Sequence, residues 1–205
     1  MPTLIRTSDP LPDEPLLLEE VKEHLNVTSD DDDTKIDNLI TAARLYMEET
    51  LGVTFMEQEF RLIYDHDELN TIRHRYWAPL PGSAIHLPRP PLVSIDEVSY
   101  VDPDGASQTW DDALYVADVN SFPGRLYPAY NECWPDMRCQ PQALTIDFTA
   151  GHDNPESIPR TWKQALLLLI THWYENPSMT TEADLKSTPM AFQSLAHSIV
   201  PPRIG

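Results

Sequence analysis

The N-terminal quarter of the chain contains two stretches whose apolar residues recur every three or four positions. The first stretch, residues 15–27, has four apolar residues at this spacing: Leu17, Leu18, Val21 and Leu25. The second follows the acidic run Asp30–Asp33 and ends at Gly52, a residue that readily adopts the left-handed C-terminal cap of a helix. The acidic run suits a helix N-terminus, because it can cap the helix and face the positive end of its dipole. The pattern predicts two helices before residue 53.

The spacing of apolar residues changes to about two after residue 53, as in strands that bury one face. The alternation is imperfect at residues 54–65 and clear at residues 143–151, where Leu144, Ile146 and Phe148 would share a face. Short segments separated by turns that contain Pro or Gly predict further strands, at residues 84–87, 92–101, 107–110, 113–118 and 124–127. Residues 67–82 are expected to form a long loop.

Helical spacing returns at residues 158–177, where Pro159 suits a first turn and Pro177 ends the helix. This helix is apolar on nearly every side, because Leu167, Leu168 and Ile170 widen the stripe of Trp162, Leu166, Leu169 and Trp173. Such a helix must be buried on nearly every side, which favours contacts with partners. Residues 178–205 are interpreted as an extended arm with an apolar patch around Phe192. Helices and strands occupy separate parts of the chain, which indicates an α+β fold.

The charge of the chain excludes a surface that grips phosphate groups. The 205 residues carry a formal net charge of −19, and residues 1–50 alone hold 13 acidic and 4 basic side chains. Affinity for DNA comes mainly from Lys and Arg, so we expect this chain to repel DNA. The uneven distribution predicts one acidic face or rim.

Targeting and membrane signals are weak in this sequence. The longest apolar run, residues 165–170, is far shorter than the roughly 20 residues that a membrane-spanning helix needs. The first residues lack the basic-then-apolar pattern of a secretory signal, and the cysteines are Cys133 and Cys139. We therefore expect no membrane span, a cytosolic origin and reduced thiols.

Two groups of residues offer metal-ligand chemistry. The carboxylates of Asp30–Asp33 suit a divalent cation, but the run lacks the glycine and the distal glutamate of a calcium loop. Cys133 and Cys139 with His152 or His172 provide zinc-ligand types, but five residues separate the cysteines and no second pair is present. A solvated helix N-terminus explains the acidic run better, and the cysteine spacing argues against zinc, so we expect no metal and no cofactor.

A hydrolytic triad is suggested by His152, Asp153 and Ser157, which follow a predicted strand. The sequence around the serine does not resemble the strained turn that makes such a nucleophile reactive. A polar turn between strand and helix is the better explanation, so we expect the protein not to be an enzyme.

Trp134 lies between prolines in a polar loop, where its ring has no obvious cover. Two alternatives stay open from the sequence: the ring packs on its own domain, or it anchors a contact with a neighbour. The Pro-rich loop would lose little entropy on docking, because prolines already restrict it. The loop around Trp134 is therefore a candidate docking surface.

Six segments follow one another between about residue 15 and residue 177: LLLEEVKEHLNV, DDDDTKIDNLITAARLYMEETLG, IHLPRPPLVSIDEVSYVDPDG, GRLYPAYNECWPD, ALTIDFTAGHD and IPRTWKQALLLLITHWYENP. The ordered set resembles the tailed-phage head-tail connector family, also called the adaptor or head completion family, in its longer branch with a β insertion. The most specific pieces are LPRPPL before a strand, YP.Y...WP and the closing HWYENP.

The resemblance implies a domain organisation. A helical connector domain would combine residues 15–52 with residues 157–177, as a bundle of the N-terminal helices and the C-terminal helix. Residues 53–150 would form an inserted antiparallel β domain. Residues 1–14 would be an N-terminal extension, and residues 178–205 an extended C-terminal arm.

The resemblance also implies a role and partners. Subunits would form a homo-oligomeric ring, typically twelve-fold, in the neck of a virion assembled in the host cytoplasm. The ring would lie beneath the portal protein and above a downstream neck or tail-completion protein. It would join head to tail and continue the DNA channel, through which packaged DNA passes without specific binding. No membrane is involved.

Two sets of residues are candidates for these contacts. The candidate subunit or portal interface comprises Trp134, Tyr127, Tyr130, Leu167, Ile170, Trp173 and Phe192. The candidate acidic lumen or rim comprises Asp30, Asp31, Asp32 and Asp33. Competing functions are a hydrolase or metalloenzyme, and a monomeric acidic binding module such as a DNA mimic.

Overall fold

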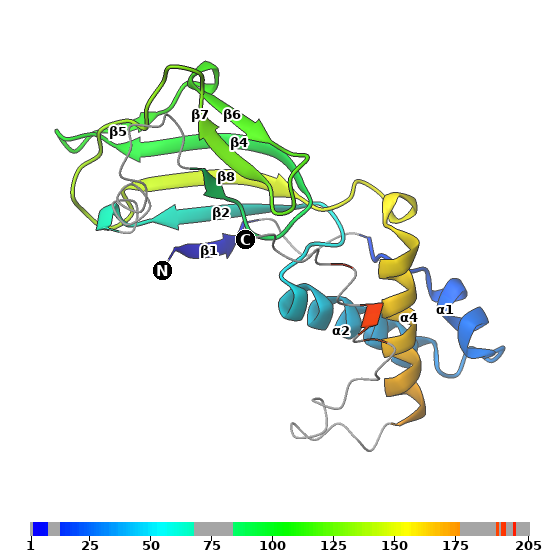
Figure 1. Ribbon diagram of the computed structural model, residues 1–205. Helices are drawn as coiled ribbons and strands as arrows, with labels where there is room; N and C mark the ends of the chain where they lie inside the picture. The colour runs from blue at the N-terminus through cyan, green and yellow to red at the C-terminus, as the bar shows by residue number, and fades with distance from the viewer. Residues whose placement is uncertain are drawn as a thin grey trace. The chain divides into compact units, whose positions relative to one another are not determined.

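The computed structural model describes residues 2–7, 13–67 and 84–176, together with residues 192, 194, 195 and 199 (Figure 1). The chain forms two compact units. We call Met1–Pro10 with Glu57–Gly151 the β unit, and Leu11–Met56 with His152–Gly205 the helical unit. The loop expected at residues 67–82 and most of the expected arm lie outside the described residues.

The β unit contains two antiparallel sheets (Figure 1). The five-stranded sheet has the order β1-β2-β8-β4-β5, with the bounds β1 Thr3–Arg6, β2 Gln58–Tyr64, β8 Leu144–Ala150, β4 Leu92–Val101 and β5 Ser107–Thr109. The three-stranded sheet has the order β3-β7-β6, with the bounds β3 Ile85–His86, β7 Arg125–Pro128 and β6 Tyr115–Asp118. A short 3-10 helix, Asp112–Leu114, precedes β6.

The core of the β unit forms around the central strand β8. Alternate residues of β8 are fully buried: Leu144, Ile146, Phe148 and Ala150. The register places Phe60 of β2 opposite Phe148, and the two rings stack with centroids 5.6 Å apart. The same core cluster includes Ile85 of β3 and Leu126 of β7, so the two sheets pack on each other through their apolar faces.

The helical unit packs α1 (Leu18–Leu25), α2 (Asp33–Leu51) and α4 (Arg160–Glu175) against one another. A short 3-10 helix, Pro155–Ser157, precedes α4. Helix α2 ends at Gly52, which has a φ of 66° and donates its N–H to the Glu48 carbonyl at 3.0 Å, as the sequence predicts. No helix in the described part of the chain is long and apolar enough to span a bilayer.

Three details differ from the expectations. Asp32 occupies the N-cap position of α2, but its side chain makes no capping hydrogen bond. The N-terminal extension contains β1, which pairs with β2 from Thr3 to Arg6. In the region expected to be an irregular arm, the described residues Phe192, Ser194, Leu195 and Ile199 have helical backbone, and Phe192 and Ile199 are buried. The pairing of β1 with β2 joins residues far apart in the sequence, so local pattern does not reveal it.

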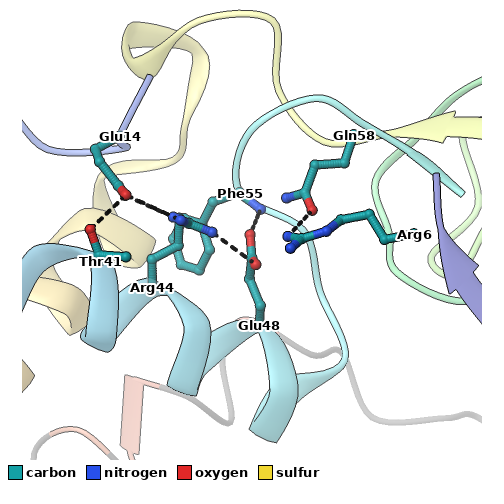
Figure 2. A network of polar contacts seen from close by, with 7 residues as sticks. All are labelled: Arg6, Glu14, Thr41, Arg44, Glu48, Phe55 and Gln58. Atoms are coloured by element: carbon teal, nitrogen blue, oxygen red, sulfur yellow. Dashed lines mark hydrogen bonds and ion pairs between the residues drawn. The ribbon is translucent and has the colours of Figure 1, made fainter. Parts of the chain in front are cut away.

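A buried arginine organises the helical unit (Figure 2). Arg44 of α2 is 5% exposed and donates to Glu14 at 2.7 and 3.1 Å and to Glu48 at 3.3 Å. Glu48 also accepts the backbone N–H of Phe55 at 3.1 Å, which fixes the chain beyond the end of α2. Burial alone would lower the pKa of Arg44, but the hydrogen bonds and charges of Glu14 and Glu48 raise it above its usual range. The arginine therefore stays charged and joins three segments.

His152 begins the second chain segment of the helical unit. Its backbone N–H donates to the Phe55 carbonyl at 3.0 Å, and its ring meets the ring of Trp162 edge-on at 5.5 Å. Among the described residues, its Nε2 is a buried side-chain atom with no hydrogen-bond partner. Burial lowers the pKa of His152 below its ordinary value, and the charge of Asp153 opposes this only in part.

Replacing Glu48 with alanine should destabilise the helical unit by about 2–3 kcal/mol, because the Phe55 N–H and one side of the Arg44 guanidinium lose a buried acceptor. Urea unfolding followed by circular dichroism measures this free energy. Asp37→Ala, an exposed change on the same helix, is the control and should cost less than about 0.5 kcal/mol. Equal stabilities of the two variants would show that the network does not support the fold.

The free energy of unfolding should decrease as pH falls below about 6.5, because the unfolded chain then binds a proton at His152 that the folded chain binds only at lower pH. The loss should continue until pH reaches the lowered pKa of the folded state. His152→Phe keeps an aromatic ring on Trp162 and removes the titration, so its stability should fall less over this range. Denaturation at a series of pH values compares the two proteins, and parallel curves would contradict the assignment.

Candidate functional site

Strands β6 and β7 expose one coherent face. Their register pairs Val116 with Tyr127 and Asp118 with Arg125, and cross-strand partners lie on the same side of a sheet. The alternate residue Leu126 points into the core and is fully buried. We call the outward set Val116, Asp118, Arg125 and Tyr127, with the adjoining Tyr130, the hairpin face.

Asp118, Ser121 and Arg125 form a compact hydrogen-bonded cluster in the polar half of the hairpin face. Arg125 donates to Asp118 at 2.7 Å and to the hydroxyl oxygen of Ser121 at 2.6 Å. The hydroxyl of Ser121 donates to Asp118 at 2.5 Å, and this bond and the Arg125 bonds lower the pKa of Asp118. Arg125 also lies over the ring of Tyr127, with its guanidinium carbon 5.5 Å from the ring centroid. The cluster fixes the strand ends and positions Tyr127.

A turn projects Tyr130 into solvent beyond β7. The backbone N–H of Glu132 donates to the Ala129 carbonyl at 2.9 Å, which closes the turn, and Asn131 has a φ of 69° that asparagine tolerates well. Tyr130 is 96% exposed, the highest value among the exposed large hydrophobic residues, and Val116 is 53% exposed. A rigid turn that presents an aromatic ring suits an interface anchor.

Trp134 packs on its own unit, and the contact with a neighbour that the sequence also allows stays a prediction. Its ring lies 4.9 Å from the ring of Trp110, which in turn lies 5.4 Å from the ring of Tyr115. Trp134 is half-buried and borders the core of the β unit. It therefore supports the loop whose exposed aromatic residue is Tyr130.

The chain itself covers three of the predicted interface residues. Leu167 and Ile170 of α4 and Phe192 are buried, with exposed fractions of 8%, 0% and 3%. Trp173 is half-buried and meets the ring of Tyr46 edge-on at 5.7 Å. The apolar circumference of α4 is thus satisfied within one chain, which corrects the expectation that it requires a neighbouring subunit.

The acidic run Asp30–Asp33 connects the three helices. Lys22 of α1 donates to Asp30 at 2.7 Å and to Asp33 at 2.6 Å, and these bonds raise the pKa of Lys22. The hydroxyl of Tyr174 on α4 donates to Asp32 at 2.6 Å. The run has four carboxylates and Lys22 pairs with two of them, and its side chains also hold α1 and α4 to the start of α2.

Exposed apolar residues that sequence reasoning missed include Leu17 and Leu45 on the helical unit and Val116 and Val119 on the β unit. Leu17 follows the helical spacing that predicted a buried face, yet it is the N-cap of α1 and is 65% exposed. The alternation at residues 113–118 places Val116 and its neighbours in β6 on opposite sides of the strand, so it could have indicated that Val116 is exposed. Of the predicted aromatic residues, Tyr127 lies on β7 and Tyr130 is exposed in the turn that follows it.

Solved structures share this fold over nearly the whole chain. A chain from the neck of an empty GTA particle, computed with C6 symmetry, has a TM-score of 0.73 at 19% identity and covers 99% of this chain and 97% of its own. A chain from the virion of a native gene transfer agent (GTA) particle has a TM-score of 0.72 at 20% identity, with 98% and 97% covered. A chain from the neck of a native GTA particle, computed with C12 symmetry, has a TM-score of 0.70 at 19% identity, with 99% and 97% covered.

Sequence comparison gives the family directly. No curated protein matches this sequence. The head completion protein family matches it over residues 16–204, which spans both the helical unit and the β unit. Since the match extends over nearly the whole chain, and the sequence segments had already indicated the same relationship, this chain belongs to the head completion protein family.

Proposed function

We propose that this chain is a structural subunit of the neck between the head and tail of a phage-like particle, without enzymatic activity. The observation that best supports this proposal is the match of residues 16–204 to the head completion family. The same fold, over nearly the full length, occurs in chains from GTA necks.

The subunits form a closed ring, which on the analogy of the neck computed with C12 symmetry contains twelve copies. A ring requires heterologous contacts, in which two different surfaces of each copy meet. The hairpin face supplies one such surface, because it combines the exposed Tyr130 and Val116 with a rigid support. Leu17 and Leu45 of the helical unit provide exposed apolar side chains for a second.

The ring surrounds the DNA channel and lies between the portal protein and a downstream neck component. A net charge of −19 suits this position, because DNA must slide past the wall without sticking to it. The acidic run Asp30–Asp33 keeps most of its negative charge despite Lys22, so it is our candidate for the rim of the channel.

The purified chain should either form a ring in solution or remain a monomer that assembles when the portal protein from the same particle is added. Native mass spectrometry of the chain alone and of the mixture measures the copy number. A monomer that ignores the portal protein would contradict the proposal. It would favour a monomeric acidic binding module, whose partner would be basic.

Tyr130→Ala should weaken ring formation or portal binding at least tenfold, because the change removes an exposed aromatic anchor. The free energy of unfolding should change by less than about 0.5 kcal/mol, because the side chain is 96% exposed. Tyr130→Phe is the matched control and should retain most of the binding. Analytical ultracentrifugation measures assembly, and unchanged assembly of the alanine variant would remove Tyr130 from the interface.

Trp134→Ala tests the supporting role of the loop. It should lower the free energy of unfolding by about 1–2 kcal/mol, because it removes a half-buried ring from Trp110. Any loss of assembly should then be partial and should follow the loss of stability, as measured by urea unfolding and sedimentation of the same samples. A stable variant that fails to assemble would instead make Trp134 a direct contact.

A further inference from the structure

We propose that His66, Asp67 and Cys139 form a binding site for a divalent zinc-class metal ion in the β unit. One ligand atom of each residue, an imidazole nitrogen, a carboxylate oxygen and the thiol sulfur, lies within 4.8 Å of the others. These are the three ligand types that zinc accepts. The inference does not depend on the proposed function.

The backbone brings the three side chains together at one end of the five-stranded sheet. His66 and Asp67 follow the end of β2, and Cys139 lies in the segment that leads into β8. The backbone N–H of His66 donates to the Gln140 carbonyl at 3.2 Å, directly beside the cysteine. The Asp65 carboxylate accepts the backbone N–H of Gln142 at 2.9 Å. These two bonds join the segment after β2 to the segment before β8, next to the cluster.

The distances between the three ligand atoms are close to those in an occupied zinc site. Tetrahedral zinc with its usual bond lengths places ligand atoms about 3.5 Å apart. The present separations are at most 4.8 Å, and His66 Nδ1 lies 3.8 Å from the Asp67 carboxylate, so coordination requires only small side-chain movements. The side chain of His66 is 18% exposed, whereas Asp67 and Cys139 are exposed.

The ligand set also selects the class of metal. A thiolate and an imidazole disfavour calcium and magnesium, which take oxygen ligands. Three protein ligands leave the fourth position of tetrahedral zinc for water. A bound ion would tie the end of β2 to the segment of residues 133–142 that carries Trp134, and would stabilise the β unit by binding the folded state alone.

The test measures zinc binding to the full chain by calorimetry, after removal of metal and with the thiols kept reduced. The expected result is one zinc ion per chain, with affinity lowered more than roughly a hundredfold in Cys139→Ser and in His66→Gln. Cys133→Ser is the matched control, because it removes the other exposed thiol and leaves the proposed ligands in place. Circular dichroism checks that each variant folds.

A second measurement compares the reactivity of the two cysteines within the same molecule. Zinc should protect Cys139 from alkylation while Cys133 continues to react, and peptide mass mapping distinguishes the two positions. Cobalt in place of zinc should give a thiolate-to-metal charge-transfer band that disappears in Cys139→Ser. Failure of the wild-type chain to bind zinc, binding that survives Cys139→Ser, or protection of Cys133 instead would each overturn the proposal.

Discussion

The buried Arg44 is the constraint on which the helical unit depends. A guanidinium that is 5% exposed is costly unless carboxylates surround it, and Glu14 and Glu48 meet this requirement from two directions. Glu48 then uses its second oxygen for the Phe55 N–H, and the Phe55 carbonyl accepts the N–H of His152. The charge of Arg44 thereby links the segment around Glu14, helix α2 and the segment that begins at His152.

The β unit combines a buried core with an exposed face on its small three-stranded sheet. Strand β8 buries every second residue between β2 and β4, and Leu126 joins the three-stranded sheet to the same core. Because the inner positions are committed to the core, the outer positions of β6 and β7 are free to carry Val116 and Tyr127. Trp134 and Trp110 brace the adjoining loop, so Tyr130 is presented by a supported turn.

Regular elements with strong periodicity were predictable from the sequence. The strand expected at 92–101 is β4, the alternating run at 143–151 contains β8, and the helix expected at 158–177 contains α4. These segments carry their own signal, because core packing requires apolar residues at the period of the element. Strand β1 carried no such signal, since it pairs only along one edge and none of its residues is fully buried. The burial of Ile170 followed from its apolar helix, whereas the packing of Trp134 on Trp110 did not follow from its polar, Pro-rich loop.

The sequence by itself determined the α+β class, the order of the strongly periodic helices and strands, the acidic charge and the family. Each of these can be inferred from local composition, from the spacing of apolar residues or from the order of short segments. Only the tertiary structure decided which carboxylates hold Arg44, that Trp134 packs on Trp110, and that Cys139 lies near His66 and Asp67. Those contacts join residues that are far apart in the chain, and strand register and loop closure, which depend on the whole core, bring them together.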